Sequence, residues 1–305
     1  MRFGINGTGL VQRASVAAIT AHAAQAAADG FSSYWLAEHP SGGFDALTAL
    51  CVAGQEVENI EFGTAIVPTS PRHPLVLAGQ ALTVQAAIGG RLTLGIGLSH
   101  EVMMAQLGIG FDKPIRHLRE YLSILMPLLT DGKVAFEGEV LSCHAELFRR
   151  AELPCPVVVA ALGPQALRVA GARTQGTTLA WVGARTVREH IAPRLRAAAD
   201  AGGRAAPRII ATLPVCVTDN PEPVRELVTK LLSHYGDLPS YRAMFDREGV
   251  DGPADVALIG DASFVQDKLR ELADAGVTDF AATEFAPAEP DRERTRELLR
   301  SAALG

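Results

Sequence analysis

Two short apolar segments on either side of a helical segment constrain the fold of this chain more than any other feature. Residues 60–67 and 91–96 are rich in apolar and β-branched side chains, as buried strands are. Between them Pro74 can open a helix, because the N–H that proline lacks has no partner in a first turn, and Gly89 and Gly90 can end it. Two strands joined by a helix of about four turns form a βαβ unit, which must be parallel and right-handed.

The same alternation continues along the chain. The expected strands occupy residues 2–6, 33–37, 60–67, 91–96, 157–161, 177–182, 208–217 and 279–283. Two irregular segments, at about 131–156 and 236–260, interrupt the pattern. Eight β/α units in 305 residues predict a (β/α)8 TIM barrel of the α/β class, with residues 1–305 forming one domain that carries both insertions. A doubly wound open sheet would suit about five or six strands better.

Composition narrows the possible functions. The net charge of −6 and the isoelectric point near 5.8 argue against a nucleic-acid partner, which needs basic surface. The cysteines match no metal-binding spacing, so we expect no metal; they are Cys51, Cys143, Cys155 and Cys216. No segment approaches the roughly 18 apolar residues of a membrane span, and no signal peptide is visible. We therefore expect a soluble, cytoplasmic protein without a membrane partner.

Candidate chemical groups follow the predicted strands, at the carboxyl edge where α/β proteins place their sites. Glu38 and His39 close the second strand, where a carboxylate and an imidazole could transfer protons. They could equally be ordinary loop residues in contact with solvent. His100 ends the fourth strand and faces the same rim. Arg72 and His73 precede the helix at Pro74, as an anion site or a plain turn with solvated charges.

Glycines mark two of these strand ends. The sequence GIGLSH at 95–100 lacks the third glycine of a dinucleotide-binding fingerprint. Its glycines could let a flat ring lie against the backbone, or could only permit a tight turn. The stretch Gly163-Pro164-Gln165 begins a helix whose free N–H groups could hold a phosphate, or it is a simple βα turn. Trp181 ends the next strand, where its indole could form a wall of the cofactor pocket or be part of the core.

Several segments, in this order, resemble one superfamily. SYWLAEH, FGTAIVPTSPRHP, GGRLTLGIGLSH, VVVAALGPQALRVAG and GTTLAWVG are similar to the bacterial luciferase-like oxidoreductases, and the similarity runs over about residues 1–300. RHP followed by GGR-x-x-LGIG-x-SH resembles the branch that uses the deazaflavin coenzyme F420.

This resemblance implies a luciferase-like barrel with the cofactor ring across the carboxyl ends of the strands. Glu38 and His39 would lie near the ring edge, with His39 the favoured proton donor or acceptor. Thr64, Ala65 and Ile66 would form a bulge behind the ring, with a cis peptide bond between Ala65 and Ile66. The remaining residues that it implies are Gly97, Ser99 and His100 beside the pyrimidine, and Gly163, Pro164 and Gln165 around the phosphate.

The activity that the resemblance implies is an F420-dependent oxidoreductase. It would move a hydride between the cofactor C5 and a small organic substrate, by C=C or C=N reduction or by alcohol oxidation. One alternative is a flavoprotein monooxygenase that uses reduced FMN, and another is a non-catalytic, ligand-binding barrel. A homodimer is also implied. The substrate itself is not predicted, because the two insertions that should shape its pocket match no known pattern.

Overall fold

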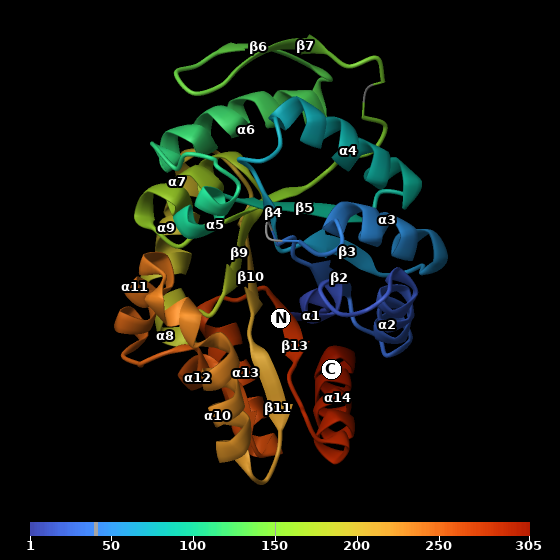
Figure 1. Cartoon of the computed structure of the whole chain (residues 1–305), viewed down its shortest axis with the longest axis vertical. Coiled ribbons are helices and arrows are strands. Elements are labelled where there is room, and N and C mark those ends of the chain that lie inside the picture. Colours follow the sequence, from blue (N-terminus) through green and yellow to red (C-terminus); the bar gives the residue numbers. More distant parts are fainter. Residues whose placement is uncertain (40–41, 150) are drawn as a thin grey trace.

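The computed structural model describes residues 1–39, 42–149 and 151–305. Eight parallel strands form a closed barrel at its centre, which confirms the predicted TIM barrel (Figure 1). In their order around the barrel they are β1 (Arg2–Asn6), β2 (Ser33–Leu36), β3 (Glu61–Thr64), β5 (Leu92–Gly97), β8 (Val157–Ala160), β9 (Gly176–Ala180), β10 (Arg208–Thr212) and β13 (Asp279–Glu284). The pairing of β13 with β1 closes the ring.

Helices connect these strands and lie outside them (Figure 1). Before the hairpin come α1 (Thr8–Val11), α2 (Val16–Ala28), α3 (Ala46–Glu56), α4 (Pro74–Ala87), α5 (Glu101–Gln106) and α6 (Pro114–Thr130). After it come α7 (Pro164–Arg173), α8 (Ala184–Thr186), α9 (Ala192–Ala201), α10 (Pro221–Leu232), α11 (Pro239–Glu248), α12 (Pro253–Val256), α13 (Ala262–Ala275) and α14 (Glu289–Leu304). No helix in the described ranges combines the length and the apolar character that crossing a membrane requires.

Several predicted elements differ in detail, among them the strand expected over 60–67, which divides into β3 and β4 (Val67–Pro68). The strand expected over 208–217 divides into β10 and β11 (Pro214–Val217), because Pro214 has no N–H to continue the ladder. The strand β11 pairs with the end of β13 and with β12 (Leu258–Gly260), and β12 was not predicted. The helix expected over 186–201 contains a π-helical turn, η1 (Val187–Ile191), before α9. The segment 236–260 is mostly helical and begins in a 3₁₀ turn, η2 (Ser233–Asp237).

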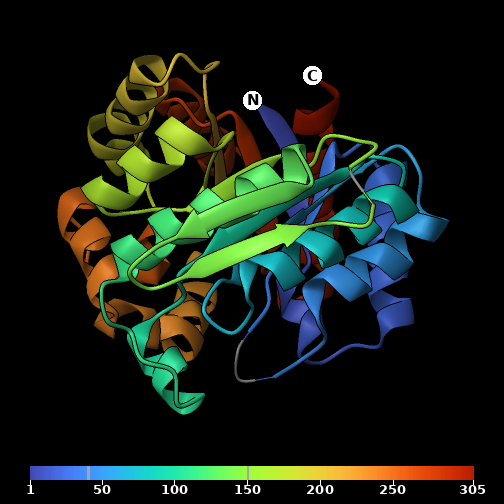
Figure 2. The ribbon, with the colours of Figure 1, turned by 90° about the horizontal axis from the view of Figure 1, so that it is seen from above.

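A hairpin forms the first insertion. Its strands β6 (Lys133–Glu137) and β7 (Ser142–Glu146) pair with each other and with no barrel strand. Figure 2 shows the hairpin lying across the outer side of the molecule, over α6. The short strand β4 (Val67–Pro68) follows β3 and pairs with β5.

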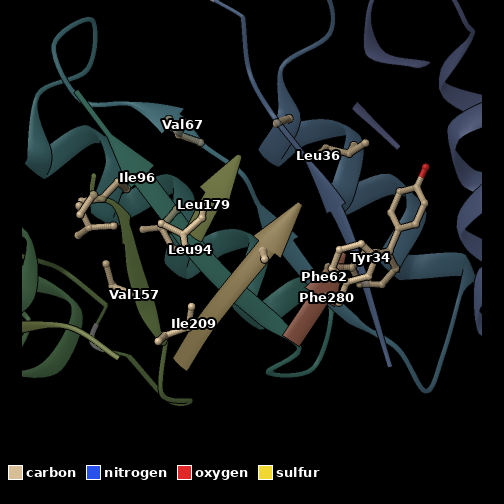
Figure 3. Close-up of a cluster of buried hydrophobic side chains, with 14 of the residues drawn as sticks. Tyr34, Leu36, Phe62, Val67, Leu94, Ile96, Val157, Leu179, Ile209 and Phe280 are labelled. Carbon is tan, nitrogen blue, oxygen red and sulfur yellow. The ribbon is translucent and has the colours of Figure 1, made fainter. Parts of the chain in front are cut away.

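The main core lies between the strands and the surrounding helices. Figure 3 shows Tyr34, Phe62, Leu94 and Ile209 among the buried side chains of this layer. Burial of so much apolar surface is the principal driving force for closing the barrel. This core therefore fixes the positions of the strand ends, where the candidate site lies.

A second, smaller cluster fills the barrel interior. Trp35, Val158, Ile210 and Ala281 pack together there, and we call these four residues the interior layer. On its amino side Arg208 crosses the barrel, donating to Glu61 from Nη1 at 2.8 Å and to Asp279 from Nη2 at 2.7 Å. The interior thus has a charged, paired layer at the amino end and a bulky apolar layer in the middle.

Candidate active site

The side chains that face the barrel interior are small at its carboxyl end. Side chains alternate along a strand, so residues two positions beyond the interior layer face the same inner space. Those residues are Ala37, Ala160, Thr212 and Thr283. They are partly exposed, whereas the interior layer beneath them is buried. The interior can therefore be reached by a ligand at the end where the strands terminate.

One side of this opening is formed by a bulge after β3. The peptide bond between Ala65 and Ile66 is cis, in agreement with the resemblance. Thr64 fixes the bulge to β5, since its Oγ1 donates to the Gly95 carbonyl at 2.7 Å and accepts from the Gly95 N–H at 2.8 Å. The amide of Glu38 donates to the Ile66 carbonyl at 2.9 Å. The bulge is therefore held from both neighbouring strands.

This contact explains one of the two glycines in β5. A Cβ atom at Gly95 would lie 1.8 Å from the Thr64 carbonyl oxygen, so only glycine allows the bulge to approach. A Cβ atom at Gly97 would lie 3.0 Å from Ile66 and 3.1 Å from Ala160. Gly95 thus serves the close approach of two strands, and Gly97 borders the open end of the interior.

Glu38 belongs to an ion-pair cluster rather than standing alone. Its Oε1 accepts from Arg72 Nη1 at 2.6 Å, and the other end of the Arg72 guanidinium contacts Asp45. Asp45 also caps α3 by accepting from the Thr48 N–H at 2.7 Å. Burial raises the pKa of Glu38 above its usual value, although Arg72 opposes the change. Its Oε2 is buried without a hydrogen-bond partner.

His39 and His100 lie on different parts of the rim. His39 follows β2, whereas His100 lies just after β5 and precedes α5. Burial lowers the pKa of both imidazoles, so both are neutral at pH 7. His39 directly follows Glu38 in the sequence, so the two residues share one part of the rim. The centroid of the His100 ring lies 5.3 Å from that of the Tyr241 ring.

Two residues at the strand ends have left-handed backbones. Ser99 has a φ of 62° and Trp181 a φ of 60°, a conformation that non-glycine residues rarely adopt. Such backbones persist only where the surroundings fix them, and they cluster at functional sites. Ser99 Oγ contacts the Met103 sulfur at 3.5 Å.

The predicted phosphate turn is an exposed helix start. Gly163 caps α7 with an extended backbone, and no atom lies within 4 Å of the place of a Cβ atom there. Pro164 and Gln165 are exposed beside it. Its preceding carbonyl, that of Leu162, lies 2.8 Å from Nε2 of the buried His190. The sequence did not predict this contact, because His190 lies in η1 and is 28 residues away from Leu162 along the chain.

Aromatic residues from the second insertion complete the rim. Tyr235 in η2 lies 5.2 Å from Trp181, and Tyr241 in α11 lies 5.5 Å from Tyr235, measured between ring centroids. We call Trp181, Tyr235, Tyr241 and His100 the aromatic wall. The sequence did not predict the two tyrosines, since only the folding of residues 233–248 brings Tyr235 to Trp181 and Tyr241 to His100.

Two other cavities lie away from the carboxyl end of the barrel. One of about 450 Å³ opens at the amino end, where Arg2, Glu61 and Arg208 line it. Another of about 620 Å³ lies between α6 and the β6–β7 hairpin. Among the described residues, no group of three or more His, Cys, Asp or Glu side chains could hold a metal ion. The carboxyl end therefore carries the candidate site, as in other TIM barrels.

Known proteins resemble the chain over nearly its whole length. A glucose-6-phosphate dehydrogenase of Kineococcus radiotolerans, named as F420-dependent, is 29% identical over 218 residues, which cover 67% of this chain and 65% of that enzyme. This match spans less than two thirds of the relative. The structure of an F420-dependent secondary alcohol dehydrogenase superposes with a TM-score of 0.82 at 16% identity, covering 98% of this chain and 97% of that one.

A second similar structure contains a different cofactor. The oxygenating constituent of 3,6-diketocamphane monooxygenase from Pseudomonas putida, in complex with FMN, superposes with a TM-score of 0.75 at 17% identity and covers 98% of this chain and 97% of its own. The family model described as luciferase-like monooxygenase matches residues 1–279. The chain therefore belongs to the luciferase-like monooxygenase family.

Proposed function

We propose that this protein is an oxidoreductase that transfers a hydride between coenzyme F420 and a small organic substrate. The observation that carries the proposal is the open carboxyl end of the barrel interior, where the inward side chains are small and which the bulge after β3, held to β5 by Thr64, borders. A flat ring needs such a surface, and relatives at 29% identity are named for this cofactor. The reaction is the reduction of a C=C or C=N bond, or the oxidation of an alcohol.

The residues present fit the deazaflavin. Thr64, Ala65 and Ile66 would support the ring from one side, with Gly97 and Ser99 beside its pyrimidine. The exposed turn Gly163-Pro164-Gln165 has room for a phosphate, and the free N–H groups of the first turn of α7 suit an anion. When bound, the cofactor would supply the carbon that gives or accepts the hydride.

In this proposal His39 handles the proton. As a neutral imidazole it can accept the hydroxyl proton of an alcohol, and after protonation it can donate to the carbon or nitrogen that does not receive the hydride. Glu38 is held by Arg72 and keeps the rim beside His39 in place. His100, also neutral, would donate a hydrogen bond to the cofactor edge rather than a full positive charge.

The cofactor decides between this function and its alternatives. We would titrate the purified protein with F420 and, separately, with FMN, following quenching of the ring fluorescence. The proposed function predicts saturable binding of F420 and weak binding of FMN. Tight binding of FMN alone, with oxygen uptake on reduction, would instead indicate a monooxygenase like the FMN-bound structural neighbour. Binding of neither would indicate a non-catalytic barrel.

We further propose that residues 1–305 act as one barrel domain and that two copies pair in the cytoplasm. Val52 on α3 and Val76 on α4 are exposed apolar side chains on neighbouring helices, as a dimer contact would require. Light scattering of the purified protein tests the dimer directly. A monomer mass at micromolar concentration would contradict it.

A further inference from the structure

We propose that the aromatic wall selects an uncharged substrate with an apolar or aromatic group next to its reacting bond. This inference rests on the proposed function and adds the substrate class to it. The wall consists of Trp181, Tyr235, Tyr241 and His100, as defined above. By this inference, phosphorylated sugars and other anions are not preferred substrates.

The first argument is geometric. The wall joins three segments, since His100 follows β5, Trp181 follows β9, and the two tyrosines belong to the second insertion. Neighbouring rings have centroids between 5.2 and 5.5 Å apart, the range of favourable aromatic contacts. Only one of the three tilts approaches a right angle, 84° between Tyr235 and Tyr241. The rings therefore form a continuous apolar surface at the rim.

The second argument concerns position. In the closed strand order, β9 lies four places from β2, so Trp181 and His39 stand on opposite sides of the barrel opening. A substrate whose reacting bond receives or loses a proton at His39 must extend toward the wall. The bound molecule would then contact the imidazole with its polar end and the aromatic rings with the rest of its surface.

The third argument is the lack of charge at the wall. Burial raises the pKa of Tyr241 and of Tyr235, and burial lowers the pKa of His100. All three side chains are thus neutral at pH 7. Burying an anion beside them without a cationic partner would be costly.

Two of the arginines on the neighbouring segments, Arg242 and Arg185, are already bonded to other groups. Arg242 donates to Asp246 and to the carbonyl of Val250, and Arg185 donates to Glu189 at 3.4 Å. Across the opening, Arg72 is shared between Glu38 and Asp45. These side chains would have to leave existing carboxylates in order to neutralise an anionic substrate.

The test compares two ketones that differ by one charge. Acetophenone and 4-acetylbenzoate would be titrated calorimetrically into the F420-loaded protein, with glucose 6-phosphate as a third probe. We expect acetophenone to bind about tenfold or more tightly than 4-acetylbenzoate, because only the second carries a buried charge. We expect glucose 6-phosphate not to bind. Equal or tighter binding of either anion would overturn the inference.

Tryptophan emission locates the ligand. The chain has two tryptophans, and Trp35 is buried in the interior layer. Acetophenone should quench the wild-type protein, and Trp181→Phe, which retains only Trp35, should lose that quenching. Tyr241→Leu should weaken acetophenone binding by about 2- to 13-fold, the value of one aromatic pair, whereas Tyr241→Phe should preserve it. Full quenching in Trp181→Phe would place the ligand elsewhere and overturn the inference.

Binding of F420 is measured separately in each variant, so the two proposals can fail independently. If F420 binds but the anions bind as well as acetophenone, the wall inference is wrong and the proposed function stands. If acetophenone still quenches Trp181 in a protein that does not bind F420, the wall selects neutral ligands and the proposed function is wrong.

Discussion

At the scale of single residues, the environment of His39 is the feature with the clearest consequence for activity. Its pKa is lowered by burial, and it is the rim imidazole beside the cis bulge after β3. Glu38, its neighbour, already bonds Arg72. We therefore assign the moving proton to the imidazole and a positioning role to the carboxylate.

His39→Ala should lower turnover by roughly 10²–10⁴, the usual contribution of a general acid or base, while F420 affinity stays within about twofold of wild type. Steady-state kinetics and cofactor fluorescence measure the two quantities. His144→Ala is the matched control, because His144 lies on the exposed hairpin and pairs with Glu137. Undiminished turnover in His39→Ala would remove this residue from the mechanism.

Gly95 and Gly79 give a second prediction at this scale. A Cβ at position 95 would overlap the Thr64 carbonyl, whereas no atom lies within 4 Å of a Cβ at Gly79, on the exposed side of α4. Gly95→Ala should therefore destabilise the protein by about 3 kcal/mol or more, or prevent folding. Gly79→Ala should stabilise it by about 0.5–1 kcal/mol.

Urea unfolding of both glycine variants decides the matter. We expect the free energy of unfolding to fall in Gly95→Ala and to rise in Gly79→Ala. A steric requirement for glycine at position 95 is thereby distinguished from the general helix preference for alanine. If Gly95→Ala were as stable as wild type, the close approach of β3 to β5 would not depend on glycine.

At the scale of elements, a carboxylate on α6 binds the turn of the hairpin, next to the ion pairs of Glu139 with Lys113 and Arg116. Glu120 on α6 is buried, and its oxygens accept from the N–H groups of Glu139, Val140 and Leu141 at 2.7–3.1 Å. These groups form the turn between β6 and β7. Burial would raise the pKa of Glu120, but the three backbone donors hold it below its usual value. The hairpin therefore depends on an interaction far away in sequence.

Glu120→Gln should loosen the hairpin by about 1–3 kcal/mol, because an amide cannot accept all three hydrogen bonds. Hydrogen exchange should speed up across residues 133–146 and remain unchanged in the barrel strands. Glu137→Gln, at an exposed position on the same hairpin, serves as the control. Uniform loss of protection throughout the barrel would contradict this local role.

At the scale of the whole molecule, the two ends of the barrel differ in their ionisable groups: the amino end contains paired charges, and the carboxyl end contains the imidazoles of the candidate site. At the amino end, burial would raise the pKa of Glu61, but Arg208 and other donors hold it below its usual value. At the carboxyl end lie three half-buried imidazoles, those of His39, His100 and His117, and the buried imidazole of His190. Burial is the main cause that lowers the pKa of His39, His100, His117 and His190.

These imidazoles predict how stability changes with pH. Their folded pKa values lie below the unfolded value near 6.5, so the unfolded chain binds more protons as the pH falls. The free energy of unfolding should therefore decrease as the pH is lowered through about 6.5. The raised pKa of Glu38 has the opposite effect on the free energy of unfolding, but it is a single group, whereas the pKa values of four imidazoles are lowered.

His117→Gln tests the linkage. Glutamine can keep a hydrogen bond to Thr69, which His117 Nε2 contacts at 3.1 Å, but it does not titrate. The slope of unfolding free energy against pH between about 5.5 and 6.5 should shrink, by at most about 1.4 kcal/mol per pH unit for one proton. Urea midpoints at several pH values provide the measurement. An unchanged slope would show that His117 does not contribute.

The alternation of apolar strands and helices by itself determined the barrel fold, because eight β/α units in a chain of 305 residues are compatible with few other arrangements. The strand ends, and with them Glu38, His39, His100 and Trp181, could be placed on one rim from the sequence. The partners of these residues could not. Arg72 reaches Glu38, His190 reaches the Leu162 carbonyl, and Tyr235 reaches Trp181 across 28 to 54 residues of chain. Such contacts depend on how the barrel closes and how the insertion folds over it, and only the tertiary structure decides that.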